Sequence, residues 1–279
     1  MKILLTACGY QGGYSLVKEF QKRGHIVVGT DMNNDCAAKF YCDKFYNTPP
    51  GSDTIYPLII EDIINEEKPD VILPGSSYEV LPMALNKRKF EKMGVKMMVS
   101  ATKVIAIATD KHFTYEILKD IISLPKYIYS ETGLVVKPIK GKGAKGIKYL
   151  KDNFIMEKLE GEHIDVDVLS LNGEFIKAEC KTRERAYGGT LMEGEIVRRM
   201  KIINQIKKVL KVLPLDYLSV WQFIDNKLIE INPRIAGAII DFNLPVMAVE
   251  LAMGEITIEE IKNYKIPYGK RVARYMHQY

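Results

Sequence analysis

The first thirty residues contain a strand, a glycine-rich turn, a helix and a second strand. Residues 2–7 (KILLTA) form an apolar run that leads into the turn at 9–13. A helical pattern covers 14–23, and a second apolar run at 26–30 ends at Asp31. This order is typical of a parallel βαβ unit, because two parallel strands need a crossover between them. It therefore commits the chain to a sheet that is covered by helices.

The same alternation continues to about residue 100. Helical patterns at 56–67 and 79–93 alternate with short apolar runs at 71–73 and 96–99. We expect residues 1–100 to form an open, doubly wound α/β domain with a parallel sheet.

Beyond residue 100 the pattern changes to short strands separated by turns. Two helical stretches at 101–108 and 110–119 precede these strands. Polar and apolar residues alternate over 163–168, which predicts a half-exposed antiparallel strand. The second half is therefore predicted to be α+β. Its expected strands before residue 190 are 126–129, 134–137, 147–150, 153–158, 163–171 and 174–181.

The last eighty residues begin with an amphipathic helix at 199–213, which Pro214 ends. A hairpin is predicted next, because Asp225-Asn226 separates two strand patterns. Those strands are 217–224 and 227–231, followed by a helix at 245–253 and a strand near 271–276. The apolar stripe of the first helix comprises Met200, Ile203, Ile206, Leu210 and Leu213.

The distribution of charge argues against a nucleic-acid partner. The 279 residues include 40 basic and 35 acidic side chains, which gives a net charge of +5. The two signs are interspersed, whereas nucleic-acid binders usually cluster Lys and Arg on one element. We therefore expect small-molecule substrates as partners and no nucleic acid.

Cysteine usage and hydropathy predict a cytoplasmic protein. The four cysteines include no CxxC pair, so reduced thiols are favoured over a zinc site or a disulfide framework. No signal-peptide pattern begins the chain, and no apolar stretch approaches the ~18 residues of a membrane helix. We expect a soluble, intracellular protein without membrane contact.

Residues 134–146 (LVVKPIKGKGAKG) combine an apolar strand with glycines and lysines. Glycines let backbone N–H groups approach phosphate oxygens, and lysines add mobile positive charge. The loop lacks the GxxxxGK[ST] pattern, and a solvated hairpin tip explains it equally well. Lys137 favours a phosphate site, because an unpaired ammonium within an apolar strand would be costly.

Residues 228–234 (LIEINPR) place oxygen ligands on a strand. Glu230 and Asn232 share a face because alternate strand residues point the same way. Gln222 faces them if the two strands pair as a hairpin. Carboxylate and amide oxygens suit Mg²⁺, and Arg234 can bind an anion bidentately beside it. An exposed hairpin with polar residues facing water is the alternative, which we consider less favoured for this combination.

With Lys137, the glycine loop and the EINPR segment, the chain resembles the ATP-grasp superfamily over nearly its whole length. It is most similar to the branch of the carbamoyl-phosphate synthetase large subunit and of amino-acid ligases such as the pyrrolysine-biosynthesis ligase. The resemblance implies a pre-ATP-grasp domain at 1–100 and an ATP-grasp domain at 101–279. Within the latter it implies a small lid at about 120–158 and a metal-binding part at 159–279.

The resemblance also implies residue roles in nucleotide binding. Lys111 and Lys137 match phosphate-contacting lysines, and Glu162 matches the acid that holds the ribose hydroxyls. The flexible loop over the phosphates matches Gly141, Gly143 and Lys145 among residues 141–146. The adenine-binding hinge matches Glu157, Lys158 and Leu159.

The implied metal ligands are Gln222, Glu230 and Asn232, for Mg²⁺ or Mn²⁺. Arg234 matches the arginine that steadies the transferring phosphoryl group, so that Arg234 and Lys137 are the implied catalytic residues. From the residues alone, Arg183 and Arg185 could grip a substrate carboxylate or equally be surface arginines near a hairpin.

The resemblance implies an ATP- and Mg-dependent carboxylate–amine (or carboxylate–ammonia) ligase that forms an acyl phosphate and releases ADP. An amino acid is expected as one of the substrates, and a homodimer is the default for the family. The chain departs from the family pattern, because about eight residues between Gly146 and Ile155 leave no room for the usual lid helix. A non-catalytic nucleotide-binding or regulatory subunit that needs a partner is therefore the alternative.

A dehydrogenase is a further alternative, because Asp31 follows the glycine turn at the distance of a ribose-binding acid. The turn GYQGG lacks the full GxGxxG spacing. A strand-end residue, or part of a substrate crevice at the carboxyl edge of the sheet, explains Asp31 better.

Overall fold

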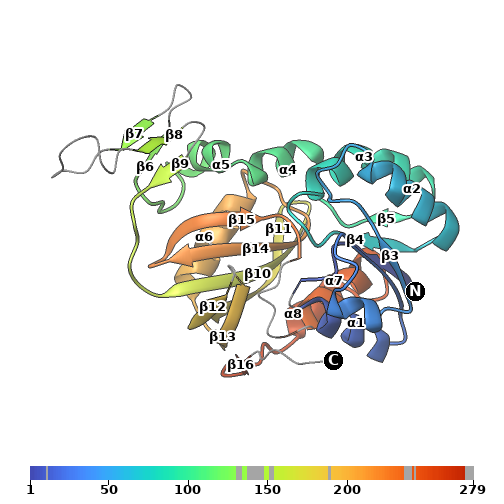
Figure 1. The fold of residues 1–279 in the computed structure, drawn as a ribbon. Coiled ribbons are helices and arrows are strands. Elements are labelled where there is room, and N and C mark those ends of the chain that lie inside the picture. The colour runs from blue at the N-terminus through green and yellow to red at the C-terminus, as the bar shows by residue number, and fades with distance from the viewer. Residues whose placement is uncertain are drawn as a thin grey trace.

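The computed structural model describes residues 1–10, 12–129, 134–136, 148–150, 154–187, 190–235, 241 and 243–273. The N-terminal part is a five-stranded parallel sheet in the order β3-β2-β1-β4-β5 (Figure 1). Its strands are β1 (Lys2–Leu5), β2 (Ile26–Asp31), β3 (Lys44–Asn47), β4 (Val71–Leu73) and β5 (Lys96–Met97). The predicted parallel α/β sheet is therefore present, with β3 as an edge strand that the sequence did not predict.

Helices cover both faces of this sheet, as a doubly wound arrangement requires. They are α1 (Gly13–Lys22), α2 (Tyr56–Glu67), α3 (Val80–Lys92) and the short 3₁₀ helix η1 (Ala37–Phe40). Alternate residues of β1 show the division: Ile3 and Leu5 pack with α1, whereas Leu4 packs with α2 and α3.

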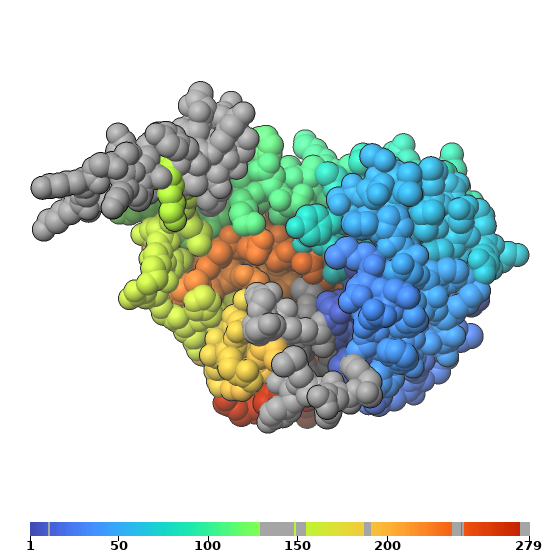
Figure 2. All heavy atoms as spheres, in the orientation of Figure 1, coloured from blue at the N-terminus to red at the C-terminus, as the bar shows by residue number. Residues whose placement is uncertain are grey.

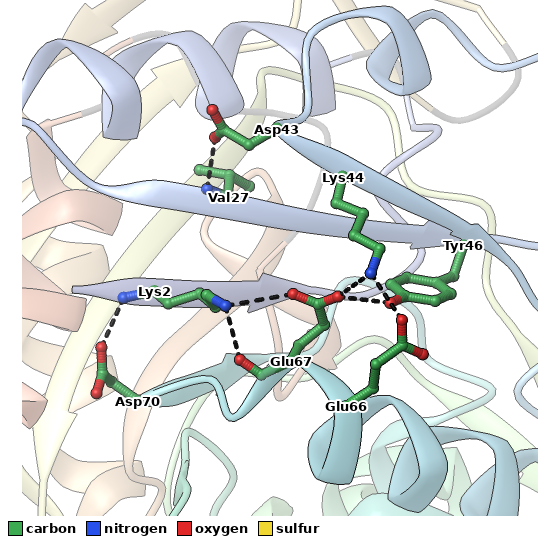
Figure 3. Close-up of polar contacts among 8 residues, drawn as sticks. All are labelled: Lys2, Val27, Asp43, Lys44, Tyr46, Glu66, Glu67 and Asp70. Carbon is green, nitrogen blue, oxygen red and sulfur yellow. Dashed lines mark hydrogen bonds and ion pairs between the residues drawn. The ribbon is translucent and has the colours of Figure 1, made fainter.

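The amino-terminal edge of the sheet is fastened by a network of charges around the buried Glu67 (Figure 3). The Lys2 Nζ donates to the Glu67 backbone oxygen at 2.7 Å, and the Tyr46 hydroxyl donates to the Glu67 carboxylate at 2.5 Å. Lys44 also ion-pairs with this carboxylate, which holds the pKa of Glu67 down at about 2. The polar loops described below lie at the opposite, carboxyl-terminal edge of this sheet.

The second sheet is antiparallel, in the order β12-β13-β11-β10-β14-β15, with β16 paired to β13. One face packs on α6 (Met200–Leu210), and the other on α7 (Asn243–Ala252) and α8 (Ile258–Asn263). The helix α7 also packs beside α1, so that the two sheets share one core cluster (Figure 1). The strands are β10 (His163–Leu171), β11 (Glu174–Thr182), β12 (Arg185–Tyr187), β13 (Thr190–Val197), β14 (Tyr217–Ile224), β15 (Lys227–Asn232) and β16 (Arg271–Ala273).

Two helices, α4 (Thr102–Thr109) and α5 (Lys111–Leu118), follow the parallel sheet along the chain. They lead to two small antiparallel pairs at the end of the molecule away from the N-terminal sheet (Figure 1). These pairs are β6 (Tyr127–Tyr129) with β9 (Phe154–Met156), and β7 (Leu134–Val136) with β8 (Lys148–Leu150). In the described part of the chain, no helix is both long and apolar enough to span a membrane.

One expectation about burial is wrong, and a second is only partly confirmed. The strand at 163–168 is antiparallel but not half-exposed, because Asp165 and Asp167 are 1% and 2% exposed. Their face of the sheet is covered by the rest of the molecule, so the polar residues lie inside. In α6 and the residues after it, the predicted stripe residues Ile206, Leu210 and Leu213 are buried. Met200 is 46% exposed, whereas Ile202 and Val209 are buried in addition, so the buried face is rotated relative to the predicted stripe.

Candidate functional site

The hairpin β14–β15 carries the predicted oxygen ligands. Its turn residues Asp225 and Asn226 have φ values of 47° and 60°, which a two-residue turn of this type requires and which Asp and Asn tolerate. The register pairs Gln222 with Glu230 and then shifts, so that β15 contains a bulge at this point. The Tyr115 hydroxyl of α5 lies 3.1 Å from the Leu228 backbone oxygen and fixes the bulged strand.

The register brings the three predicted ligands to one face. Gln222 lies opposite Glu230, and Val220 lies opposite Asn232. On the other face Trp221 packs in the core against α6. Gln222, Glu230 and Asn232 therefore form a short row of oxygen donors that faces away from that core.

Asp165 extends this row onto β10, because it pairs with Gln222 in the register. Arg183 holds Asp165 in a bidentate ion pair, with Nε at 2.9 Å and Nη2 at 2.7 Å from its two oxygens. Arg183 therefore reaches the row, whereas Arg185 is half-exposed and pairs with Glu193 on β13 at 2.7 Å. The two arginines that the sequence grouped lie in different surroundings.

A cavity of about 280 Å³ lies in front of Glu230 and Asn232. It is lined from three parts of the chain: the loop with Ser77, the α4–α5 junction with Lys111, and β15. In Figure 2 the atoms of β14 and β15, in orange, are set back between the green helices and the blue N-terminal part. The Lys111 Nζ lies 2.8 Å from a Glu230 carboxylate oxygen, so that a mobile cation is already placed beside the acid.

Arg234 connects this cavity to the carboxyl edge of the parallel sheet. Its Nε donates to the Ser77 Oγ at 2.8 Å, and its Nη1 donates to the Ile235 backbone oxygen at 2.8 Å. Its Nη2 lies 3.5 Å from the Asn232 Oδ1. Burial lowers the pKa of Arg234, but a guanidinium stays charged in proteins. The side chain is therefore a fixed positive fork next to the oxygen row.

The loop that meets Arg234 is itself held by a buried acid. Glu79 accepts hydrogen bonds from the Thr6 hydroxyl at 2.8 Å and from the Gly75 and Ser76 backbone N–H groups at 2.7 and 2.9 Å. Burial raises the pKa of Glu79. This carboxyl group shapes the loop, so that Ser77 can reach Arg234.

A second cluster of buried charges lies on the same face of the second sheet. Glu179 lies opposite Asp167, and the buried Lys181 ion-pairs with Asp167. Burial raises the pKa of Glu179 to about 8. This acid therefore changes charge near neutral pH.

The residues expected around the nucleoside lie along the segment after β9. The Glu157 carboxylate binds Lys227 at 2.5 Å and the Lys126 backbone N–H at 3.1 Å, so it is already engaged. Lys158 is exposed and Leu159 half-buried. Glu162 ion-pairs with Arg199 before α6. Lys137, Gly141, Gly143 and Lys145 lie outside the described residues.

A second cavity, of about 210 Å³, lies at the carboxyl edge of the parallel sheet. Asp31 lines it and accepts hydrogen bonds from the Gly9 and Asn33 backbone N–H groups at 2.7 and 2.8 Å. Tyr78 lines both cavities, so the two are neighbours. Asp31 thus borders a crevice of the kind in which α/β sheets bind ligands.

The donor set fits a hard divalent cation. Gln222 and Asn232 offer neutral oxygens and Glu230 a charged one, which are the ligands that Mg²⁺ prefers when it also binds phosphates. The cations Lys111 and Arg234 beside them suit a polyanion. The arrangement can therefore hold a metal–nucleotide complex and neutralise a phosphoryl group in transfer.

Comparisons with known proteins find relatives of both halves of the chain. The model of the PylC-like N-terminal domain matches residues 3–98, and the model of the ATP-grasp in the biosynthetic pathway with Ter operon matches residues 150–277. The biotin carboxylase subunit of pyruvate carboxylase superposes with a TM-score of 0.64 at 16% identity, over 92% of this chain and 72% of that one. The chain belongs to the ATP-grasp superfamily.

Two further comparisons give a relative in sequence and a solved structure with a similar fold. The tyramine–L-glutamate ligase of Methanocaldococcus fervens is 29% identical over 223 residues, which are 75% of this chain and 72% of that protein. The N5-carboxyaminoimidazole synthetase from Staphylococcus aureus, solved with ADP, superposes with a TM-score of 0.58 at 16% identity, over 84% of this chain and 70% of that one. This ATP-grasp protein is an enzyme that forms carbon–nitrogen bonds between small molecules.

Sequence reasoning missed several residues of the site. Ser77 contacts the oxygen row, Asp165 extends it onto β10, and Tyr115 fixes the bulge in β15. The position of Ser77 after a buried parallel strand was a usable signal, because ligands bind at the carboxyl ends of such strands. The sequence placed Asp165 on an exposed face, because alternating polar and apolar residues are typical of a strand with one side in solvent.

Proposed function

We propose that this ATP-grasp enzyme uses ATP and Mg²⁺ to activate a carboxylate as an acyl phosphate and then joins it to an amine, with release of ADP and phosphate. The observation that carries the proposal is the row of Gln222, Glu230 and Asn232 on one face, with Lys111 and Arg234 beside it. A divalent ion held there would supply charge neutralisation to the β- and γ-phosphates when bound.

Arg234, one of the side chains that we assign to phosphoryl transfer, is preorganised. Arg234 is fixed by Ser77 and by the Ile235 carbonyl, so it can meet the charge that develops on the γ-phosphoryl oxygens without reorganisation. Lys111 can leave Glu230 for a phosphate oxygen, because its half-exposed ammonium is a mobile point charge. Lys137 and the glycine loop at 141–146 would cover the phosphates from the lid at about 120–158.

The cavity beside Asp31 is our candidate for the second substrate, since it adjoins the metal-site cavity through Tyr78. The name of the archaeal relative gives L-glutamate and tyramine as the first pair to test. An amino acid then supplies the carboxylate or the amine, and no protein nucleophile is required. We assign residues 1–100 and 101–279 to the pre-ATP-grasp and ATP-grasp domains.

Replacing Glu230 tests the proposal. Glu230→Gln keeps the shape but removes the negative charge, and we expect a roughly 10²-fold loss of kcat/KM for L-glutamate- and tyramine-dependent ADP release, a size typical of removing one preorganised charged group. The exposed Glu174→Gln is the matched control and should retain full activity. Equal activity of the two variants would refute the metal assignment.

A coupled screen separates the ligase from a nucleotide-binding subunit that needs a partner. We expect ADP to form only when a carboxylate and an amine are both present, with the amide detected by mass spectrometry. Tight binding of Mg-ATP without ADP formation, across a panel of amino acids and amines, would favour the subunit.

A further inference from the structure

Three potential metal ligands meet where the start of β2 touches the end of α7. The ligand atoms of His25, Glu250 and Glu255 all lie within 4.8 Å of one another. His25 immediately precedes β2, at the amino-terminal edge of the sheet, and the two acids come from the last turn of α7 and the turn that follows. The group is therefore separate from the oxygen row at β15, and the proposed ligase function assigns it no role.

The end of α7 folds back in a way that brings its two acids together. Gly254 has a φ of 76°, which favours glycine. Its N–H donates to the Leu251 carbonyl at 3.1 Å, and the Glu255 N–H donates to the Glu250 carbonyl at 2.8 Å. These two bonds define a Schellman motif. The motif places Glu255 over the last turn, next to the Glu250 side chain.

His25 points into this group with an unused nitrogen. Its side chain is 7% exposed, and among the described residues the buried Nε2 has no hydrogen-bond partner. The distance from Nε2 to the Glu250 Oε1 is 3.9 Å, too long for a hydrogen bond. A buried imidazole nitrogen without a partner is costly, so the position calls for a ligand.

The charge state of His25 suits metal binding. Burial lowers its pKa, assisted by the N-terminal amine and Arg23, while Glu255 and Glu250 act in the opposite direction. A lowered pKa favours the neutral imidazole, whose lone pair can bind a metal.

Arg23 orients the Glu250 carboxylate without using all of its acceptor positions. The Arg23 Nη1 lies 3.1 and 3.2 Å from the two oxygens, and its Nη2 donates to the Asn243 Oδ1 at 2.9 Å. A carboxylate offers about four lone-pair directions, so it can accept from a guanidinium and bind an ion as well. Metal-binding carboxylates are commonly held by such partners.

We propose that His25, Glu250 and Glu255 bind a transition-metal dication of the Zn²⁺ type, which links the N-terminal sheet to the C-terminal helix. One imidazole nitrogen and two carboxylate oxygens are ligands of this class, whereas Mg²⁺ favours an all-oxygen shell. Around a tetrahedral ion with bonds of about 2.0–2.1 Å, neighbouring ligand atoms lie about 3.3 Å apart, so the 3.9 Å pair needs only a small adjustment.

Calorimetric titration of ZnCl₂ into the full-length protein, with excess Mg²⁺ present, tests the site. We expect one Zn²⁺ per chain, at least tenfold weaker binding by Glu255→Gln and by His25→Ala, and unchanged binding by Glu259→Gln. Glu255 and Glu259 are both exposed, so neither substitution should disturb folding. A second readout is the melting temperature, which Zn²⁺ should raise in the wild type but not in Glu255→Gln.

The cysteines are the competing ligands for Zn²⁺, and one variant distinguishes them. Cys36→Ser removes a thiol from the turn that packs around Gly9 and leaves the His25 group intact. We expect it to bind Zn²⁺ as the wild type does. Loss of binding in Cys36→Ser with retention in Glu255→Gln, or no saturable binding by the wild type, would overturn the proposal.

Discussion

At the scale of single residues, Arg234 depends on both sheets for its position. Its guanidinium uses Nε for Ser77 and Nη1 for the Ile235 carbonyl, while Nη2 lies near Asn232. These contacts need the planar fork of an arginine, because a lysine ammonium cannot reach them together. The geometry of the group, and not only its charge, should therefore matter for the reaction.

Arg234→Lys tests this dependence on geometry. We expect kcat to fall by roughly 10- to 100-fold although the positive charge is retained, because a single point charge replaces an oriented pair of donors. Steady-state measurement of ADP release checks the value. The exposed Arg198→Lys should have wild-type kcat, and a kcat for Arg234→Lys within twofold of that control would contradict the assigned role.

Glu179 should make stability depend on pH. Its pKa is raised by burial from the ordinary 4.5 to about 8. Between these values the folded state keeps a proton that the unfolded state releases, so this group's contribution to stability falls as pH rises. The slope is up to about 1.4 kcal/mol per pH unit and vanishes above pH 8.

Glu179→Gln removes this proton uptake. We expect the free energy of unfolding of the variant, relative to the wild type, to rise with pH from about 4.5 to 8, as measured by urea denaturation at several pH values. The exposed Glu174→Gln should follow the wild type at every pH. A constant difference between wild type and Glu179→Gln would show that Glu179 is not protonated in the folded protein.

At the scale of elements, the hairpin β14–β15 decides where the oxygen donors point. A strand shifted by one residue turns its side chains to the opposite face. The tight turn at Asp225 and Asn226 and the bulge in β15 together set this register. The precision of the metal-binding face is therefore a property of the turn as much as of the ligands.

Asn226→Val tests the turn. Asn226 has a φ of 60°, which a β-branched residue adopts at a cost of about 1–2 kcal/mol. We expect urea unfolding to show a loss of this size relative to Asn226→Gly, which relaxes the same position. Equal stability of the valine and glycine variants would mean that the backbone does not hold this conformation.

Many of the helices and strands could be predicted from the sequence. The helix at 56–67 matches α2 at both ends, and the hairpin strands were placed to within a residue, because apolar periodicity and the Asp-Asn turn are local signals. The strands β12 and β13 and the helix α8 were missed. β12 is a short edge strand that pairs with β13, β13 pairs with the distant β16, and α8 begins at a capping box at Thr257.

The candidate site was predictable to a similar degree. The common face of Gln222, Glu230 and Asn232 followed from strand alternation and a hairpin. The Ser77–Arg234 contact did not, because it joins residues 157 positions apart. The burial of Asp165 was equally hidden, since alternation alone cannot say which side of a strand meets solvent.

At the scale of the whole molecule, the site exists because three parts of the chain converge. The parallel sheet supplies the loop with Ser77, the junction of α4 and α5 supplies Lys111, and the antiparallel sheet supplies Glu230 and Asn232. The shared core between α1 and α7 keeps the two sheets in place. Phosphoryl transfer requires such fixed positioning more than it requires a reactive side chain.

The most direct measurement of the central claim follows an oxygen atom. If the enzyme forms an acyl phosphate, a carboxylate oxygen attacks the γ-phosphorus, and the amine later displaces phosphate that retains this oxygen. With L-glutamate labelled with ¹⁸O in its carboxylates, tyramine and Mg-ATP, mass spectrometry should find one ¹⁸O in each phosphate released with the amide. Amide formation accompanied by unlabelled phosphate would contradict the account.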